Sequence, residues 1–301
     1  MKINTKRLLA VMLSVFVAMG FMVPFTQTAS AASKTKTFYV TTQTKTVYKN
    51  EDGSKETFLL KYKYNKNGLV TEAYSKGYVS DGSTTKYTRN SAGIVKTAKT
   101  YDKDGKQIEE RKGTIKNGKV TKSRTYTFID GKKKLAESST FTYTKKGQIK
   151  KEVVTHEDYG KSTYIYTYWP NGNTKKMICR SSDYKYVENF DKKGNLTSTK
   201  TTYGTGEYKT TTTATYKYKF NKKGYVTKEV VTEKMTDASG NTTKTVRTYT
   251  YKYTYNKAGY VKREESNYTS KTGDHTYKSS SVTTYKYKKV KVPKKYWKFF
   301  E

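Results

Sequence analysis

A short unit recurs along most of this chain: aromatic residues at alternate positions, a polar turn that ends on glycine, and an aliphatic residue two places later. Clear copies span residues 64–70, 190–196, 220–226 and 255–261, and residues 143–149 repeat the unit with Thr144 at the first turn position. Asn or Asp at that position accepts a local backbone hydrogen bond, and only glycine enters the left-handed region cheaply. The unit therefore predicts a type I turn followed by a bulge, a common closure of a β-hairpin.

The turn geometry also predicts which residues face each other across each hairpin. Each pair places an aromatic residue opposite an aliphatic one, a cross-strand combination that stabilises sheets. The expected pairs are Tyr64 with Val70, Phe190 with Leu196, Phe220 with Val226, and Tyr255 with Val261. The glycines expected at such corners are Gly68, Gly105, Gly147, Gly194, Gly224 and Gly259.

Further turn signals fall between these copies, so the chain contains roughly 17 candidate turns connecting about 18 strands. Strands joined in this way pair with their sequence neighbours. The predicted fold class is therefore all-β, a long antiparallel meander of repeated hairpins. Because open twisted sheets rarely exceed about ten strands without curling, we expect a curved or spiralling open sheet; whether it closes is left open.

The composition alone would indicate disorder. After residue 31, Leu, Ile, Val and Phe make up about 14% of the chain, a fraction typical of disordered proteins when the net charge is high. However, the chain has 31 tyrosines, and in strands such as residues 216–220 they alternate with lysine. Alternation sends rings and ammonium groups to opposite faces of a strand. We therefore expect one face of tyrosines, most of them used in packing, and one face of Lys and Thr.

Residues 1–31 have the features of an export signal. Lys2, Lys6 and Arg7 precede an apolar stretch over residues 8–23, and Ala29-Ser30-Ala31 follows it. This stretch is shorter than the roughly 20 residues that span a bilayer, which favours a cleaved signal over a membrane anchor. We expect a signal peptide at 1–31, a β-hairpin repeat domain at 32–292 and a basic aromatic tail at 293–301. The signal looks bacterial, and the lack of disulfides fits a Gram-positive source.

The chain after residue 31 carries 58 basic and 25 acidic residues, a net charge of +33. Such a charge indicates long-range attraction to polyanions; alternatively, lysines merely keep the sheet soluble and protect its edges. The partners predicted are wall teichoic acid, acidic polysaccharide or extracellular nucleic acid. The lysines expected to bind them are Lys217, Lys219, Lys222, Lys223, Lys252, Lys286 and Lys288.

Few residues suit catalysis. His156 and His275 lie near candidate turns but are far apart in sequence, and Glu109-Glu110 are interpreted as salt partners of neighbouring basic residues. The lone Cys179 cannot form an internal disulfide, so it is either a half-buried filler or an intermolecular link. We therefore predict a protein that is not an enzyme, with no catalytic, metal or cofactor site.

The C-terminal tail mixes cations with aromatic residues. Tyr296, Trp297, Phe299 and Phe300 are expected either to cap the end of the sheet or to anchor the chain at a wall or at an anionic membrane surface.

Two groups of motifs resemble known repeat families. Tyr101-Asp102-Lys103-Asp104-Gly105 and residues 190–196 are similar to the tyrosine-aspartate (RHS-type) repeats of bacterial surface and toxin-delivery proteins. Residues 168–173 and 116–120 look more like MORN-type hairpin repeats. The resemblance implies a hairpin architecture and a surface location, and it carries over no catalytic residue. The chain is too short for a closed toxin shell.

Together these observations predict a secreted or surface-associated protein that binds anionic wall polymer or another extracellular polyanion. The alternative is a structural or adhesion matrix component that self-associates through its strand edges.

Overall fold

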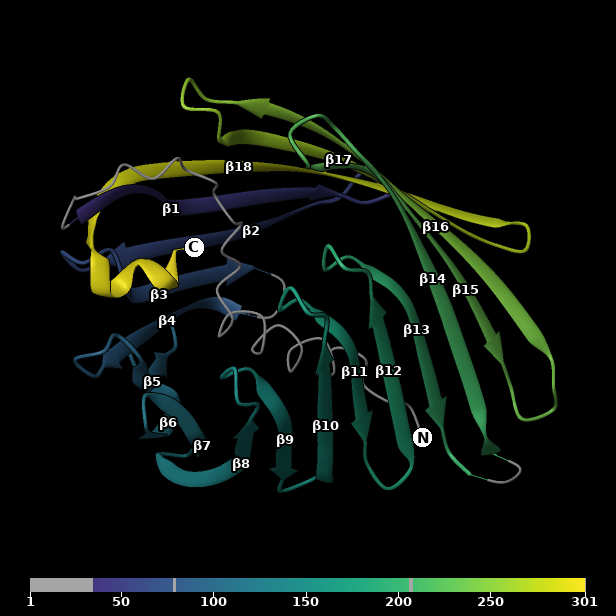
Figure 1. Ribbon diagram of the computed structural model, residues 1–301. Coiled ribbons are helices and arrows are strands. Elements are labelled where there is room, and N and C mark those ends of the chain that lie inside the picture. Colours follow the sequence, from purple (N-terminus) through teal and green to yellow (C-terminus); the bar gives the residue numbers. More distant parts are fainter. Residues whose placement is uncertain (1–34, 78–79, 206–207, 301) are drawn as a thin grey trace. The chain divides into compact units, whose positions relative to one another are not determined.

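The structure is a computed structural model. It describes residues 35–77, 80–205 and 208–300, so the predicted export signal at 1–31 lies outside the described residues. The described chain forms a sheet of 18 strands, and each strand pairs with its neighbours in the sequence. The registers that are resolved in detail are all antiparallel. The prediction of an antiparallel meander of 18 strands is therefore confirmed (Figure 1).

The strands follow each other with short connections, and one 3-10 helix ends the described chain. In order they are β1 (Thr35–Lys49), β2 (Lys55–Tyr64), β3 (Val70–Gly77), β4 (Ser80–Arg89), β5 (Val95–Tyr101), β6 (Gln107–Lys116), β7 (Lys119–Ile129), β8 (Lys132–Tyr143), β9 (Ile149–His156), β10 (Gly160–Tyr168), β11 (Thr174–Arg180), β12 (Tyr184–Phe190), β13 (Leu196–Tyr203), β14 (Thr210–Phe220), β15 (Val226–Thr236), β16 (Thr242–Tyr255), β17 (Val261–Thr272), β18 (His275–Pro293) and the helix η2 (Lys294–Phe299).

The expectation of an open, curved or spiralling sheet is wrong. The first strand, β1, pairs both with β2 and with the last strand, β18, and Figure 1 shows yellow β18 beside purple β1. The meander therefore closes on itself with the connectivity of a β-barrel. Closure depends on strand tilt and on the stagger summed over all strands, and a turn pattern that repeats locally does not encode that sum.

The turn register, by contrast, is confirmed. Tyr64 pairs with Val70, Phe190 with Leu196, Phe220 with Val226 and Tyr255 with Val261, and in each case the register shifts by a bulge next to the aromatic residue. The six glycines named above have φ angles between 76° and 90°.

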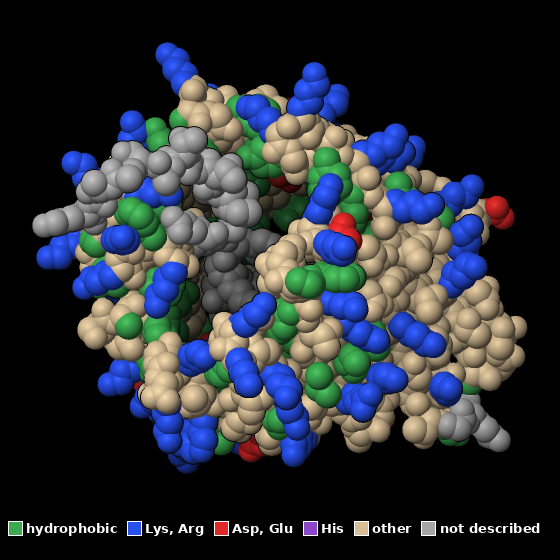
Figure 2. Space-filling view, in the orientation of Figure 1, with side chains coloured by type: hydrophobic (Ala, Val, Ile, Leu, Met, Phe, Trp, Pro, Cys, Tyr) green, Lys and Arg blue, Asp and Glu red, His purple; other side chains and the backbone are tan. Residues whose placement is uncertain are grey.

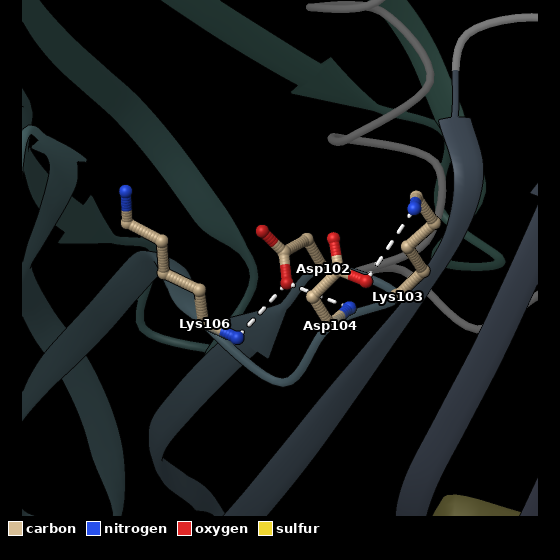
Figure 3. Close-up of polar contacts among 4 residues, drawn as sticks. All are labelled: Asp102, Lys103, Asp104 and Lys106. Atoms are coloured by element: carbon tan, nitrogen blue, oxygen red, sulfur yellow. Dashed lines mark hydrogen bonds and ion pairs between the residues drawn. The ribbon is translucent and has the colours of Figure 1, made fainter.

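The turn after β5 shows the chemistry that sets this register (Figure 3). Asp102 Oδ1 accepts hydrogen bonds from the backbone N–H groups of Asp104 (3.0 Å) and Lys106 (2.9 Å). The Gly105 N–H donates to the Asp102 carbonyl at 3.2 Å, with Gly105 at φ 81°. One carboxylate thus satisfies two turn donors, which explains why Asp or Asn begins so many of these turns.

The chain divides into two compact units. Unit 1 contains residues 35–46, 56–108 and 284–300, and unit 2 contains residues 47–55 and 109–283. Unit 1 has an apolar core made by Phe38, Val40, Leu69, Val292, Tyr296 and Phe300. Val292 is fully buried, and the Phe38 and Phe300 ring centroids lie 4.9 Å apart. The C-terminal helix η2 and Phe300 therefore supply part of this core.

Unit 2 has few buried aliphatic side chains, and tyrosines take their place. The rings of Tyr249 and Tyr268 lie 4.8 Å apart. Several hydroxyl groups tie neighbouring hairpins together, since Tyr168 donates to the Ile149 carbonyl and Tyr253 to the Val226 carbonyl, both at 2.6 Å. Tyrosine thus contributes ring packing and also an interstrand hydrogen bond, the combination that a thin sheet without a deep interior needs.

Candidate functional site

The strands of unit 2 have two chemically different faces. In β14, Tyr216 and Tyr218 are half-buried, whereas Lys217 and Lys219 are exposed. The same alternation in β16 leaves Lys252 exposed between half-buried tyrosines. In these two strands lysine therefore occupies one face and tyrosine the other, as alternation requires.

The tyrosine face of unit 2 also carries glutamates, which sequence reasoning did not anticipate. Glu229 lies opposite Tyr218 on one side and Tyr249 on the other, and Glu152 lies opposite Tyr164. Tyr186 Oη donates to Glu188 Oε1 at 2.7 Å. The sequence contained enough information to place Glu229 on this face. The turn register that pairs Phe220 with Val226 puts Glu229 opposite Tyr218 after one bulge. Part of the acidic charge of unit 2 is thus separated from the lysine face.

Burial on the tyrosine face changes how these carboxyl groups titrate. Desolvation raises the pKa of Glu109, Glu152, Glu188 and Glu229 above the usual glutamate value. Glu110 points to the other face, and there the hydrogen bond from Lys133 holds its pKa below the usual value. Adjacent glutamates in β6 therefore respond to pH in opposite directions because they belong to opposite faces of the sheet.

These shifts predict that unit 2 is more stable at about pH 5.5 than at pH 8, by about 1 kcal/mol. A carboxyl group with a raised pKa binds its proton more tightly in the folded protein, so the stability gained at lower pH is lost as pH rises through the folded pKa. Urea unfolding at both pH values measures the difference. Glu188→Gln should reduce it, and Glu56→Gln, at an exposed position of β2, should not. Equal stability at both pH values would contradict the prediction.

Two isolated side chains from the sequence analysis have ordinary surroundings. His156 Nδ1 lies 3.6 Å from Glu137 Oε2, and no cluster of three metal-ligating side chains occurs among the described residues. Cys179 is buried in β11, and burial raises the pKa of its thiol. Low thiolate content makes such a cysteine unreactive.

One edge of unit 2 collects a row of five turns, four of which carry lysine, and this row is here called the basic rim. Its turns are Thr144–Gly147, Trp169–Gly172, Asp191–Gly194, Asn221–Gly224 and Asn256–Gly259, each closed by a hydrogen bond from the glycine N–H to the first carbonyl. They join alternate strand pairs and therefore lie at the same end of the strands, about 10 Å from one turn to the next. The rim lysines are Lys145, Lys146, Lys192, Lys193, Lys222, Lys223 and Lys257, and all are exposed.

Side-chain hydrogen bonds join neighbouring turns of the rim. Gln148 Nε2 donates to the Gly172 carbonyl at 2.8 Å. Asn171 Nδ2 and Asn173 Nδ2 donate to the Lys192 carbonyl at 2.7 and 2.9 Å. Three consecutive turns are thereby held together, so the lysines they carry keep a defined spacing.

Trp169 lies at the centre of these three turns. Its Nε1 donates to the Phe190 carbonyl at 3.1 Å. Lys175 Nζ lies 4.8 Å and Lys192 Nζ 5.8 Å from the centroid of the Trp169 ring. Further along the rim, Lys223 Nζ lies 3.7 Å from the Tyr255 ring centroid. Cations therefore gather around aromatic rings on this edge.

The seven lysines expected to bind polyanions are divided between the two units. Lys217, Lys219 and Lys252 project from the strands of unit 2, and Lys222 and Lys223 belong to the basic rim. The remaining two, Lys286 and Lys288, belong to unit 1, where Lys288 Nζ lies 5.0 Å from the Tyr64 ring centroid. Figure 2 shows many Lys and Arg side chains and few acidic ones on the face it presents.

The tail residues pack within unit 1. Tyr296 and Phe300 are buried in its core, and Trp297 and Phe299 pack against that core. Trp297 Nε1 donates to the Val292 carbonyl at 2.8 Å. Capping of the sheet by the tail remains a proposal. Among the described helices, none is long and apolar enough to cross a membrane.

Neither a protein-family model nor a curated protein matches the chain. Among solved structures, a porin-like protein from Bacteroides uniformis is 13% identical, with 82% of this chain and 96% of that chain covered and a TM-score of 0.45. A porin-like protein from Bacteroides vulgatus is 11% identical, with 82% and 98% covered and a TM-score of 0.36. The KdgM porin in complex with disordered oligogalacturonate is 10% identical, with 83% and 98% covered and a TM-score of 0.20.

These findings correct several expectations. The solved structures named above are porins or porin-like proteins, which contradicts the resemblance to RHS-type and MORN-type repeats. The physical reason is that Asn/Asp-to-Gly turns suit any antiparallel meander and do not identify a family. The same comparisons contradict a secreted, wall-polymer-binding protein of a Gram-positive bacterium, and that function and location are withdrawn. The alternative of self-association through strand edges fails because β1 and β18 pair with each other.

Proposed function

We propose that this chain is a non-enzymatic, channel-type β-barrel, which its closed strand connectivity favours, and that the basic rim of unit 2 takes an anionic polymer. The observation that carries the proposal is the separation of charge in unit 2. Carboxyl groups such as Glu188 and Glu229 are half-buried on the tyrosine face, whereas the rim lysines are exposed. Among the described residues, none of the rim lysines forms an ion pair.

Lysines without ion pairs, spread over four of the five rim turns, attract a polymer that carries charges along its length. Each lysine demands little geometric precision from its anionic partner. Binding releases counterions from the polymer, so affinity falls steeply with salt. The ligand chemistry that fits is a chain of carboxylate or sulfate groups that crosses several turns of the rim.

Replacing Lys222 and Lys223 together with Gln should weaken binding of an acidic polysaccharide about tenfold at low salt. It should also reduce the slope of log affinity against log salt by about 2, because two ionic contacts are lost. Isothermal titration of the purified protein at several salt concentrations measures both quantities.

The matched control is Lys234→Gln with Lys244→Gln. These lysines are exposed, pair across β15 and β16, and lie near the turn at the opposite end of β15. The control removes the same charge from the same unit but away from the rim. Equal losses in the two double variants would mean that net charge, and not the rim, determines binding, which overturns the proposed site.

A second candidate is a barrel that binds the polymer at its rim without conducting it. Strands that face lipid carry a continuous apolar band on that side, whereas the lysine face described above carries Lys and Thr. Conductance across planar bilayers distinguishes the two functions. Stable single-channel steps from the purified protein would support the channel over the binding protein.

A further inference from the structure

We infer that Trp169 forms a subsite for an acidic sugar ring, with Lys175 and Lys192 positioned to neutralise its carboxylate. This inference rests on the proposed function, because it assigns a ligand class to the same basic rim. The indole is only partly buried, and both ammonium groups lie within 6 Å of its ring.

The indole is held in place before any ligand arrives. Its Nε1 hydrogen bond to the Phe190 carbonyl fixes the ring against the next turn. Asn171 and Asn173, beside Trp169 in the sequence, also donate to the Lys192 carbonyl in that next turn. A ring fixed in advance loses little conformational freedom on binding, which favours affinity.

The neighbouring turns supply charge on both sides of Trp169. Lys145 and Lys146 lie on the preceding turn of the rim, and Lys192 and Lys193 on the following one. Adjacent turns are about 10 Å apart. A linear polymer that crosses these turns therefore meets a lysine pair, an aromatic platform and another lysine pair in sequence.

This order favours an acidic polysaccharide over a single-stranded nucleic acid. Proteins that bind single strands stack successive bases on a series of aromatic side chains. Trp169 is the one aromatic residue within the five rim turns themselves, and the ring of Tyr255 beside the rim already has Lys223 Nζ 3.7 Å from its centroid. One stacked ring with charges to either side suits a chain of uronic acid residues.

The two tryptophans of the chain, Trp169 and Trp297, allow a direct test. In a Trp297→Phe background, Trp169 is the sole tryptophan and reports on its own surroundings by fluorescence. The probe is a uronic acid oligosaccharide, and its methyl-esterified form is the uncharged control. We expect a saturable change in emission with the acid and a much weaker one with the ester.

Affinity measured independently by calorimetry should fall about tenfold in Trp169→Leu. Because this variant also loses the bond to Phe190, Lys175→Gln provides a second test that leaves the indole in place. It should weaken binding of the acid about threefold and leave binding of the ester unchanged.

The possible failures are distinguishable. In one outcome the oligosaccharide binds, and the Lys222→Gln, Lys223→Gln double variant weakens this binding, but neither Trp169→Leu nor Lys175→Gln does. The subsite is then overturned while the proposed function stands. If the oligosaccharide does not bind at low salt, both are overturned. If single-stranded DNA changes the Trp169 emission with equal or higher affinity, the assignment to an acidic sugar is overturned.

Discussion

Removing residues 294–301 should lower the free energy of unfolding by at least about 3 kcal/mol, because burial of each large apolar side chain contributes roughly 1.5–3 kcal/mol. Tyr296 and Phe300 are 6% and 7% exposed, and Val292 beneath them is fully buried. The truncation removes two core rings and opens Val292 and Leu69 to water. Urea unfolding followed by circular dichroism measures the loss.

The charge of the tail is tested separately. The triple variant Lys294→Gln, Lys295→Gln, Lys298→Gln keeps every ring and should unfold within about 0.5 kcal/mol of the unmodified chain, because these lysines are exposed. A truncated protein as stable as the full chain would rule out capping. So would a triple variant as unstable as the truncation, since charge would then be the stabilising element.

Gly93→Val should destabilise unit 1 by about 3–5 kcal/mol, combining left-handed backbone strain with overpacking. Gly93 has a φ angle of 83°. A Cβ atom there would lie 2.8 Å from a ring carbon of Phe299 and 3.1 Å from side-chain carbons of Leu69 and Tyr296. Any side chain at this position pushes against the docked tail.

Gly105→Val is the matched control for this substitution. Gly105 has a φ angle of 81° in the same type of turn, and a Cβ atom there would meet nothing within 4 Å. The Gly105→Val variant should be destabilised only by backbone strain, which lowers its free energy of unfolding by roughly 1–2 kcal/mol. In combination with Phe299→Ala, Gly93→Val should cost less than it does alone, because the nearest clash is gone. Equal losses at both glycines would show that the tail does not pack on this turn.

The sequence was informative wherever the structure is determined within one hairpin. The turn that begins at Asp102 and ends at Gly105 contains its own hydrogen-bond partners, so its conformation follows from four or five residues. The same local geometry predicted that Tyr255 faces Val261. Once that pair is known, the alternation of side chains along the strand assigns its other residues to one face or the other. The strand content and the two faces could therefore be predicted without any tertiary information.

The candidate site required more than one hairpin. Gln148, Trp169 and Lys192 belong to three different turns, and their contacts arise because β9 to β12 stand side by side in the sheet. Nothing in the residues around Trp169 alone indicates that Phe190 will accept its hydrogen bond. The sorting of Glu152 onto the tyrosine face likewise needs the registers of β9 with β8 and with β10.

The amino-acid sequence by itself determined the hairpins of the repeated unit: where their turns fall, which residues face each other across them, and which side of a strand such as β14 is cationic. Only the tertiary structure decided that β1 meets β18 and that the tail enters the core of unit 1. Both contacts join segments more than 200 residues apart. Their formation depends on the stagger accumulated over all the intervening strands, which no single turn contains.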